Sequence, residues 1–247
     1  MTWAALARKP LVVSVDWDFF FPYWPEWDWG HAENPLFEKW AWLARALDRP
    51  GLVEEYRPVP QYRAFWDALA GKGLRPRKVF VAESHVRLYG LVLSSGLRGV
   101  RVLHFDAHHD AWPLRGDGRV TCENWLAALL RAGAVEEALW VRPSWGFWRE
   151  EEPPPLPEGV ETMTWEEFLG ADIGPARETP FAFVCRSPAW TPPWADSKFR
   201  EFLALAPARP EFLEPVADRH FDIRAVREAH EKMAAFLRQL VKREITA

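Results

Sequence analysis

Apolar segments of strand length alternate along this chain with segments of helical periodicity. This alternation is typical of a mostly parallel sheet covered by helices, because two parallel strands need a crossover connection between them. The expected strands are residues 11–15, 78–82, 100–105, 138–141, 160–163 and 181–185. The expected helices are residues 36–47, 61–70, 86–94, 124–131, 194–205 and 223–243. The pattern predicts one α/β domain, residues 1–247, with three layers (αβα) and a doubly wound sheet.

Local capping signals support three of the helix starts. Thr164 and Glu167 have the spacing of a capping box. Thr191 precedes a proline as an N-cap residue does, and Asp222 is positioned to cap the last helix.

The strand expected at 100–105 ends in a run of metal-ligand side chains, Asp106-Ala-His-His-Asp110. Alternate residues of an extended chain point to the same side, so Asp106, His108 and Asp110 are expected to converge beyond the strand. Carboxylate oxygens beside an imidazole suit manganese, iron or zinc.

Two other strands end in similar residues. Asp16 and Asp18 follow the first strand, and burying both carboxylates would be costly without a cation. His85 follows the strand at 78–82. Since ligands bind beyond the carboxyl ends of parallel strands, all these side chains are expected at one edge. Together they would suit two divalent ions about 3.5 Å apart.

The composition favours a small-molecule partner. The formal net charge is -4, and without a long basic run this argues against nucleic-acid binding through phosphates. No apolar stretch reaches the roughly 18 residues of a membrane span, and no signal peptide is recognisable, so we expect a cytoplasmic protein without a membrane partner. A homo-oligomer is compatible with the sequence. Cys122 and Cys185 are interpreted as reduced thiols, and the scarcity of amide side chains is compatible with a thermophilic source.

Several motifs resemble those of one enzyme family. Asp106-Ala-His-His-Asp110 resembles the Asp-Ala-His-x-Asp signature of the arginase and agmatinase ureohydrolases. Ser14-Val-Asp16-Trp-Asp18 resembles their Ser-x-Asp-x-Asp strand, and Glu83-Ser-His85 resembles their Gly-Gly-Asp-His segment. Further segments resemble poorly characterised arginase-like proteins: Asp16 to Phe20, Cys122-Glu-Asn-Trp125 and Ser187-Pro-Ala-Trp-Thr-Pro192.

The resemblance implies an arginase-like sheet with a binuclear manganese centre. Asp106 and Asp16 would bridge the two ions. The remaining ligands would be His85 and Asp110 at one ion, and His108 and Asp18 at the other.

The chain departs from the ureohydrolase pattern in two ways. The Ser-x-Asp-x-Asp strand comes first, as though it had been moved to the N-terminus. Glu83-Ser84 replaces the glycine-rich approach to the histidine, and no loop histidine or guanidinium-binding acidic residue can be matched. The substrate is therefore not implied.

The expected reaction is attack of a metal-bridging hydroxide on a guanidine, amidine or amide carbon, with manganese, zinc or another divalent ion. Asp106 would act as the catalytic bridging ligand. His109 and Glu123, with Glu83, are the candidates for protonating the leaving group. His104 lies inside an apolar strand and is interpreted as a packing residue.

Other functions are compatible with the same residues. One is a deacetylase-like amidohydrolase with a single zinc at Asp106, His108 and one carboxylate. Another is a magnesium phosphatase of the haloacid-dehalogenase type, with Asp16 as nucleophile and Asp18 as acid/base. A third is a non-catalytic metal-binding domain. The aromatic run Phe19–Trp29 is either a pocket wall or lid, or a loop or subunit contact held by its own rings.

Overall fold

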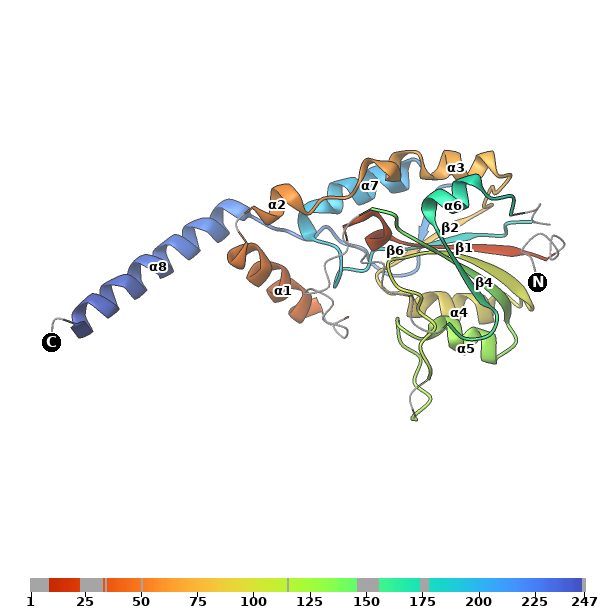
Figure 1. Ribbon diagram of the computed structural model, residues 1–247, viewed down its shortest axis with the longest axis horizontal. Coiled ribbons are helices and arrows are strands. Elements are labelled where there is room, and N and C mark those ends of the chain that lie inside the picture. Colours follow the sequence, from red (N-terminus) through yellow and green to blue (C-terminus); the bar gives the residue numbers. More distant parts are fainter. Residues whose placement is uncertain are drawn as a thin grey trace.

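The computed structural model describes residues 9–22, 33, 35–49, 51–114, 116–145, 156–173 and 178–245. In these residues seven strands form one sheet in the order β5-β4-β3-β1-β6-β2-β7, and every pair is parallel. The strands are β1 (Leu11–Asp16), β2 (Val79–Ala82), β3 (Val100–Phe105), β4 (Val135–Arg142), β5 (Val160–Thr164), β6 (Ala182–Cys185) and β7 (Pro210–Phe212). β1 lies in the middle of the sheet, between β3 and β6 (Figure 1).

Helices cover both faces of this sheet. The helices of the described residues are α1 (Pro35–Asp48), α2 (Leu52–Glu55), α3 (Phe65–Gly71), α4 (Val86–Ser94), α5 (Trp125–Arg131), α6 (Trp165–Gly170), α7 (Asp196–Ala204) and α8 (Ile223–Ile245). α3, α6 and α7 lie over one face, and α4 and α5 lie over the other (Figure 1). α8 contacts α1 and extends away from the sheet (Figure 1). The α/β class and its helix-covered parallel sheet are therefore as the sequence predicts.

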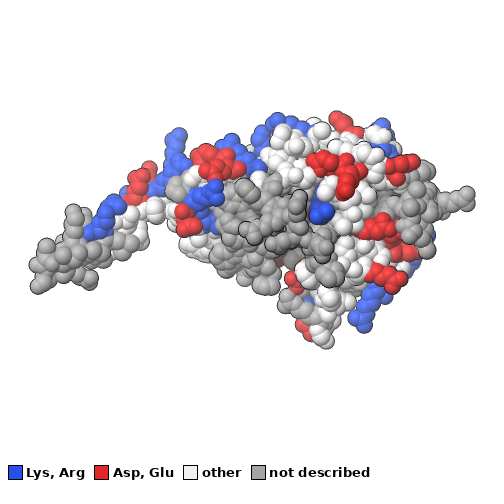
Figure 2. Space-filling view, in the orientation of Figure 1, with Lys and Arg blue, Asp and Glu red and all other residues white. Residues whose placement is uncertain are grey.

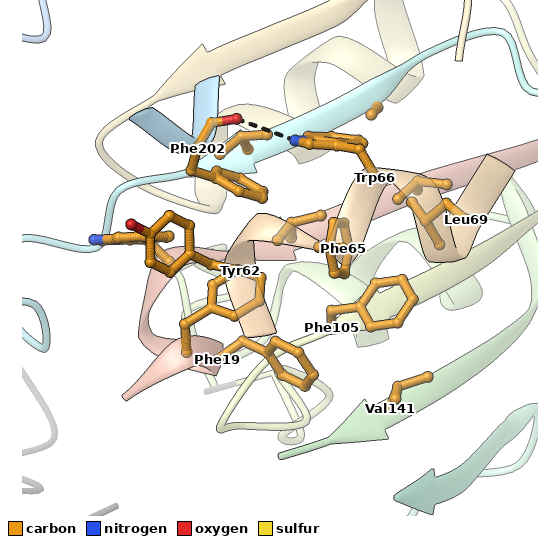
Figure 3. Packing of buried hydrophobic residues seen from close by; sticks show 14 of the residues in the cluster. Phe19, Tyr62, Phe65, Trp66, Leu69, Phe105, Val141 and Phe202 are labelled. Carbon is orange, nitrogen blue, oxygen red and sulfur yellow. Dashed lines mark hydrogen bonds between the residues drawn. The ribbon is translucent and has the colours of Figure 1, made fainter. Parts of the chain in front are cut away.

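Apolar runs form the central strands because both faces of the sheet are buried. All six residues of β1 and all six of β3 are buried. On one face, Phe65 and Leu69 of α3 and Phe202 of α7 pack with Phe105 and Val141 of the sheet (Figure 3). Full burial of one such side chain contributes about 1.5–3 kcal/mol.

The opposite face has a core of its own. Leu88 of α4 and Leu126 of α5 pack there with Val102 and Ala138 of the sheet. Alternation along each strand sends neighbouring side chains into different cores, which is why Val13 and Val12 belong to separate clusters. Two cores separated by one sheet make the three layers.

Most element boundaries match the sequence predictions, but two of the expected helices are each divided into a 3-10 turn and an α-helix. The helix expected at 61–70 is a 3-10 turn, Pro60–Arg63, followed by α3, and that expected at 194–205 is a 3-10 turn, Pro193–Ala195, followed by α7. Each turn has a proline in its first positions, where the fixed φ favours a tight start. β7 and α2 were not predicted.

Two of the three capping predictions are confirmed. Thr164 and Glu167 form a capping box, and the Asp222 carboxylate accepts hydrogen bonds from the first turn of α8. The prediction for Thr191 is wrong, since Pro192 is the N-cap residue. The Thr191 hydroxyl instead donates to the carbonyl oxygens of Arg186 and Ser187, which precede it in its own loop.

The described surface has mixed charge. Acidic and basic side chains are interspersed over the described part of the face in view (Figure 2). Among the described residues, no helix combines the length and the apolar character needed to cross a membrane.

Candidate metal centre

β1, β2 and β3 bring the predicted ligands to the carboxyl edge of the sheet. Asp16 is the last residue of β1, and Asp18 follows in the 3-10 turn Trp17–Phe20. Asp106 comes directly after β3, and His85 precedes α4. Because β1 pairs with β3 in parallel, the two acidic strand ends lie side by side.

One group of ligand atoms surrounds His85. Its Nδ1 atom lies 3.1 Å from Asp16 Oδ2. The same atom lies 3.3 Å from Asp106 Oδ2 and 3.3 Å from Asp110 Oδ2. Atoms bound to one cation at about 2.1 Å are separated by about 3.0–3.4 Å at octahedral or tetrahedral angles. We call these four buried residues the inner group; the three distances from His85 Nδ1 to its carboxylate oxygens fall in that range.

A second group lies on the other side of Asp106. His108 Nδ1 is 3.2 Å from Asp18 Oδ2 and 3.5 Å from Asp106 Oδ1. We call Asp18, Asp106 and His108 the outer group; their ligand atoms lie within 4.8 Å of one another. Asp106 thus presents Oδ2 to the inner group and Oδ1 to the outer group, as a bridging carboxylate would.

Hydrogen bonds from outside the groups orient the ligands. Trp125 Nε1 donates to Asp110 Oδ2 over 2.7 Å. The Ser187 hydroxyl donates to Asp16 Oδ2, and the Ser14 hydroxyl lies 3.0 Å from His85 Nε2. His85 therefore has its Nε2 side occupied by Ser14, which leaves Nδ1 for the carboxylates.

Crowding of buried carboxylates shifts their pKa values upward. Burial, with the charge of Asp16, raises the pKa of Asp18 to about 6. Burial raises the pKa of Asp110 to about 7, against the opposing charges of His85 and His108. Burial and the charge of Asp18 raise the pKa of Asp106 well above its ordinary value. Repulsion among carboxylates is what a cation at this position would remove.

Imidazoles compensate part of that repulsion. Burial lowers the pKa of His85, but the hydrogen bond and charge of Asp16 outweigh it and the net pKa is raised. Burial also lowers the pKa of His108, and Asp106 and Asp18 then raise it well above its ordinary value. Burial raises the pKa of Asp16, yet His85 brings it below the ordinary value.

Unpartnered atoms mark the same place. Asp106 Oδ2 and His104 Nε2 are buried without a hydrogen-bond partner, which is unusual in a folded protein. Clusters able to hold a metal among the described residues are Asp16/His85/Cys185, His85/His104/Asp106 and Asp18/Asp106/His108. Oxygen-rich sets with imidazole nitrogen fit manganese, iron or zinc.

The candidate acids have different surroundings. His109 is buried between Trp112 and Trp140, its Nδ1 accepts from the Ala111 N–H, and burial lowers its pKa to about 4. Glu123 is half-buried, and its carbonyl oxygen accepts from the Trp112 N–H.

Glu83, the third candidate acid, is held by an arginine. Its carboxylate forms an ion pair with the guanidinium of Arg186.

The structure adds residues that the sequence analysis did not assign to the site. His104 reaches the inner group, and Ser187 contacts Asp16 from a loop 171 residues away. Cys185 is the register partner of Asp16. Glu33 forms side-chain hydrogen bonds with Ser84 and Cys122. Strand alternation from Asp106 back to His104 was the available signal for His104, and the arginase-like segment Ser187–Pro192 was the signal for Ser187; the contacts of Cys185 and Glu33 had none.

Only the first part of the aromatic run Phe19–Trp29 lies in the described residues. Phe19, Phe20 and Phe21 are buried in the core beside β1 and pack against rings such as Phe65 and Tyr56. Residues 23–29 lie outside the described residues. An aromatic ring that does face the ligands comes from another loop: Trp190 lies 5.6 Å from the ring of His108.

Comparison of the chain with protein-family models, curated proteins and solved structures gave no match. The resemblance to ureohydrolases remains a prediction from short motifs. A functional assignment therefore rests on the inner and outer groups themselves.

Proposed function

We propose that this protein is a metal-dependent hydrolase that cleaves a carbon–nitrogen bond of a guanidine, amidine or amide. Two divalent cations, expected to be manganese, would be held by the inner and outer groups. The observation that carries the proposal is Asp106, whose two carboxylate oxygens face separate sets of ligand atoms. Buried like charges at this spacing are costly unless a cation joins them.

A bound divalent cation supplies a lowered pKa for water and a positive charge beside an electrophilic carbon. The protein's own residues fix the geometry. Asp106 sets the separation of the two groups, Trp125 orients Asp110, and Ser187 orients Asp16. Such outer contacts typically change metal affinity or activity roughly 10–100-fold when removed.

Glu123 is the proposed proton donor to the leaving group. Glu123 is half-buried, and its backbone carbonyl oxygen accepts from the N–H of Trp112, two residues beyond the ligand loop 106–110, whereas His109 is buried with a pKa of about 4. A neutral imidazole of that pKa is a poor acid near pH 7. His109 then serves as a packing and hydrogen-bonding residue of the ligand loop.

Metal counting and a substrate panel test the proposal. Chelator-treated protein is titrated with Mn²⁺ and with Zn²⁺, bound metal is counted after dialysis, and ammonia, urea or amine release is measured from guanidines, amidines and amides. We expect two ions per chain and turnover of one substrate class. Asp106→Asn should weaken binding at least about 1000-fold, at about 1.4 kcal/mol per tenfold. Asp67→Asn, on the exposed face of α3, is the matched control.

Three outcomes would overturn this function. One zinc at Asp106 and His108 with no second ion indicates the deacetylase-like alternative. Phosphate-ester hydrolysis that survives Asp106→Asn but not Asp16→Asn indicates the phosphatase. Metal binding without turnover of any substrate indicates a non-catalytic metal-binding domain.

A further inference from the structure

Ser14 and His104 lie directly opposite each other on neighbouring strands. They are register partners of β1 and β3, and both are fully buried. The Ser14 hydroxyl oxygen lies 3.0 Å from His85 Nε2 and 3.3 Å from His104 Nδ1. One hydroxyl therefore connects a proposed ligand, His85, with a histidine of the strand interior.

His104 turns its other nitrogen toward the carboxylates. His104 Nε2 lies 3.3 Å from Asp106 Oδ2 and 3.8 Å from Asp110 Oδ2. Both Nε2 and Asp106 Oδ2 are buried without a hydrogen-bond partner. Trp125 packs against the rings of His85 and His104 and so limits their rotation.

The number of protons available fixes the donor and acceptor roles of His85, Ser14 and His104. If His85 uses Nδ1 toward a cation, its ring proton is on Nε2 and is donated to the Ser14 oxygen. The Ser14 hydroxyl proton then needs an acceptor, and His104 Nδ1 is within reach. A buried hydroxyl proton left without an acceptor costs about 1–3 kcal/mol. A neutral His104 that accepts at Nδ1 must carry its proton on Nε2, facing Asp106.

We propose that Ser14 and His104 are positioning residues that form a hydrogen-bonded chain from His85 toward Asp106. The direction is His85 Nε2–H to Ser14 and Ser14 O–H to His104 Nδ1, which leaves His104 Nε2–H facing Asp106 Oδ2 at 3.3 Å. The chain holds an inner-group histidine and the shared carboxylate in one fixed relation. This inference rests on the proposed metal centre and extends it to residues that are not ligands.

Direct ligation by His104 is the competing arrangement. It would require His104 Nδ1–H and His85 Nε2–H both to donate to Ser14. The Ser14 hydroxyl proton would then have neither histidine as acceptor. The two arrangements differ in the position of one ring proton and in the number of imidazole nitrogens at the metal.

Nuclear magnetic resonance of the full chain loaded with diamagnetic Zn²⁺ distinguishes them. Long-range ¹⁵N–¹H correlation reports which ring nitrogen of each histidine is protonated. We expect the proton of His104 on Nε2 and that of His85 on Nε2. A His104 proton on Nδ1, or a zinc-bound Nε2, would overturn the proposal.

Metal affinity provides a second readout that does not require turnover. His104→Leu should weaken Zn²⁺ and Mn²⁺ binding about 10–100-fold. His104→Gln should recover most of the affinity, because its amide N–H can reach the position of Nε2. His230→Gln, exposed on α8, is the matched control and should bind as the wild type does.

The outcomes separate this inference from the proposed function. Wild-type protein that binds no metal refutes the metal-centred function. A His104→Leu variant that binds metal as strongly as the wild type refutes only the positioning chain. If His104→Leu does not fold, His104→Gln and Ser14→Ala replace it, and affinity in Ser14→Ala equal to that of the wild type refutes the chain.

Discussion

Two loops border the candidate centre, and they differ in how their polar groups are satisfied. The ligand loop, 106–110, follows β3, and the wall loop, 187–192, follows β6. Each contains a non-glycine residue with positive φ, Asp110 at 51° and Ser187 at 48°; no other described non-glycine residue has one. Such backbone persists where surrounding contacts enforce it.

Side chains from several elements hold the wall loop through its carbonyl oxygens. Trp42 Nε1 donates to Pro188 O over 2.8 Å, and Arg219 donates to the carbonyl oxygens of Pro188, Thr191 and Pro192. Arg219 also forms a partly buried ion pair with Asp196. Satisfied buried polar networks rigidify a segment.

Polar atoms of the ligand loop are left without partners. Asp106 Oδ2 and His109 Nε2 are buried and have no hydrogen-bond partner, and the pKa values of Asp106 and Asp110 are raised. Both loops therefore have a left-handed residue after a strand, but the wall loop is stabilised by its contacts, whereas the ligand loop lowers the stability of the metal-free protein. Cation binding would account for the presence of the destabilising ligand loop.

The largest predicted effect is a pH dependence of the metal-free protein. Asp110 has a folded pKa of about 7 against an ordinary value of 3.8, and the pKa of Asp18 is raised to about 6. These two carboxyls therefore bind more protons in the folded state between pH 4 and 7, so their contribution to the unfolding free energy falls as pH rises. His85 and His108, with raised pKa values, act in the same direction as these carboxyls at higher pH, whereas His104 and His109, with lowered pKa values, oppose them. Asp110 alone would contribute about 4 kcal/mol, at about 1.4 kcal/mol per unit.

Urea denaturation at several pH values, with chelator, measures this slope. Asp110→Asn should flatten it. Saturating Mn²⁺ should reverse it, because ligands must lose protons to bind. Equal slopes in the wild type and in Asp110→Asn would contradict the account of the ligand loop.

A smaller effect is expected when the wall loop loses its main donor. Arg219→Ala should lower the unfolding free energy by about 3 kcal/mol, since it leaves Asp196 partly unpaired and removes donors from three carbonyl oxygens. Arg200→Ala is the control, because Arg200 pairs with Asp218 on the surface and should change stability by less than about 0.5 kcal/mol. Equal losses of stability in Arg219→Ala and Arg200→Ala would show that the contacts of Arg219 do not stabilise the wall loop.

The smallest effect isolates backbone strain at Ser187. Ser187→Ala and Ser187→Gly both lose the hydrogen bond to Asp16, but glycine adopts the left-handed conformation without a Cβ penalty. Ser187→Gly should therefore be about 1 kcal/mol more stable than Ser187→Ala in thermal or urea unfolding. An alanine variant at least as stable as the glycine variant would exclude strain at this residue.

Particular residues show how far sequence reasoning reached. The strand at 100–105 matches β3 at both ends, and the helix at 86–94 matches α4, because their periodicity and punctuation are unambiguous. The prediction that Thr191 is an N-cap residue was wrong, because its hydroxyl donates instead to a carbonyl oxygen of its own loop. His104 was assigned to packing because a lone polar residue in an apolar strand does not reveal its neighbour.

The sequence by itself determined the α/β class, the strands that end in acidic residues, and six side chains suited to bind cations: Asp16, Asp18, His85, Asp106, His108 and Asp110. Periodicity and residue type are local properties, so they can be read along the chain. Only the tertiary structure decided that β1 lies between β3 and β6. That order sets Ser14 against His104 and brings Ser187 to Asp16. Strand order depends on how crossover helices pack on the sheet, and local pattern does not encode it.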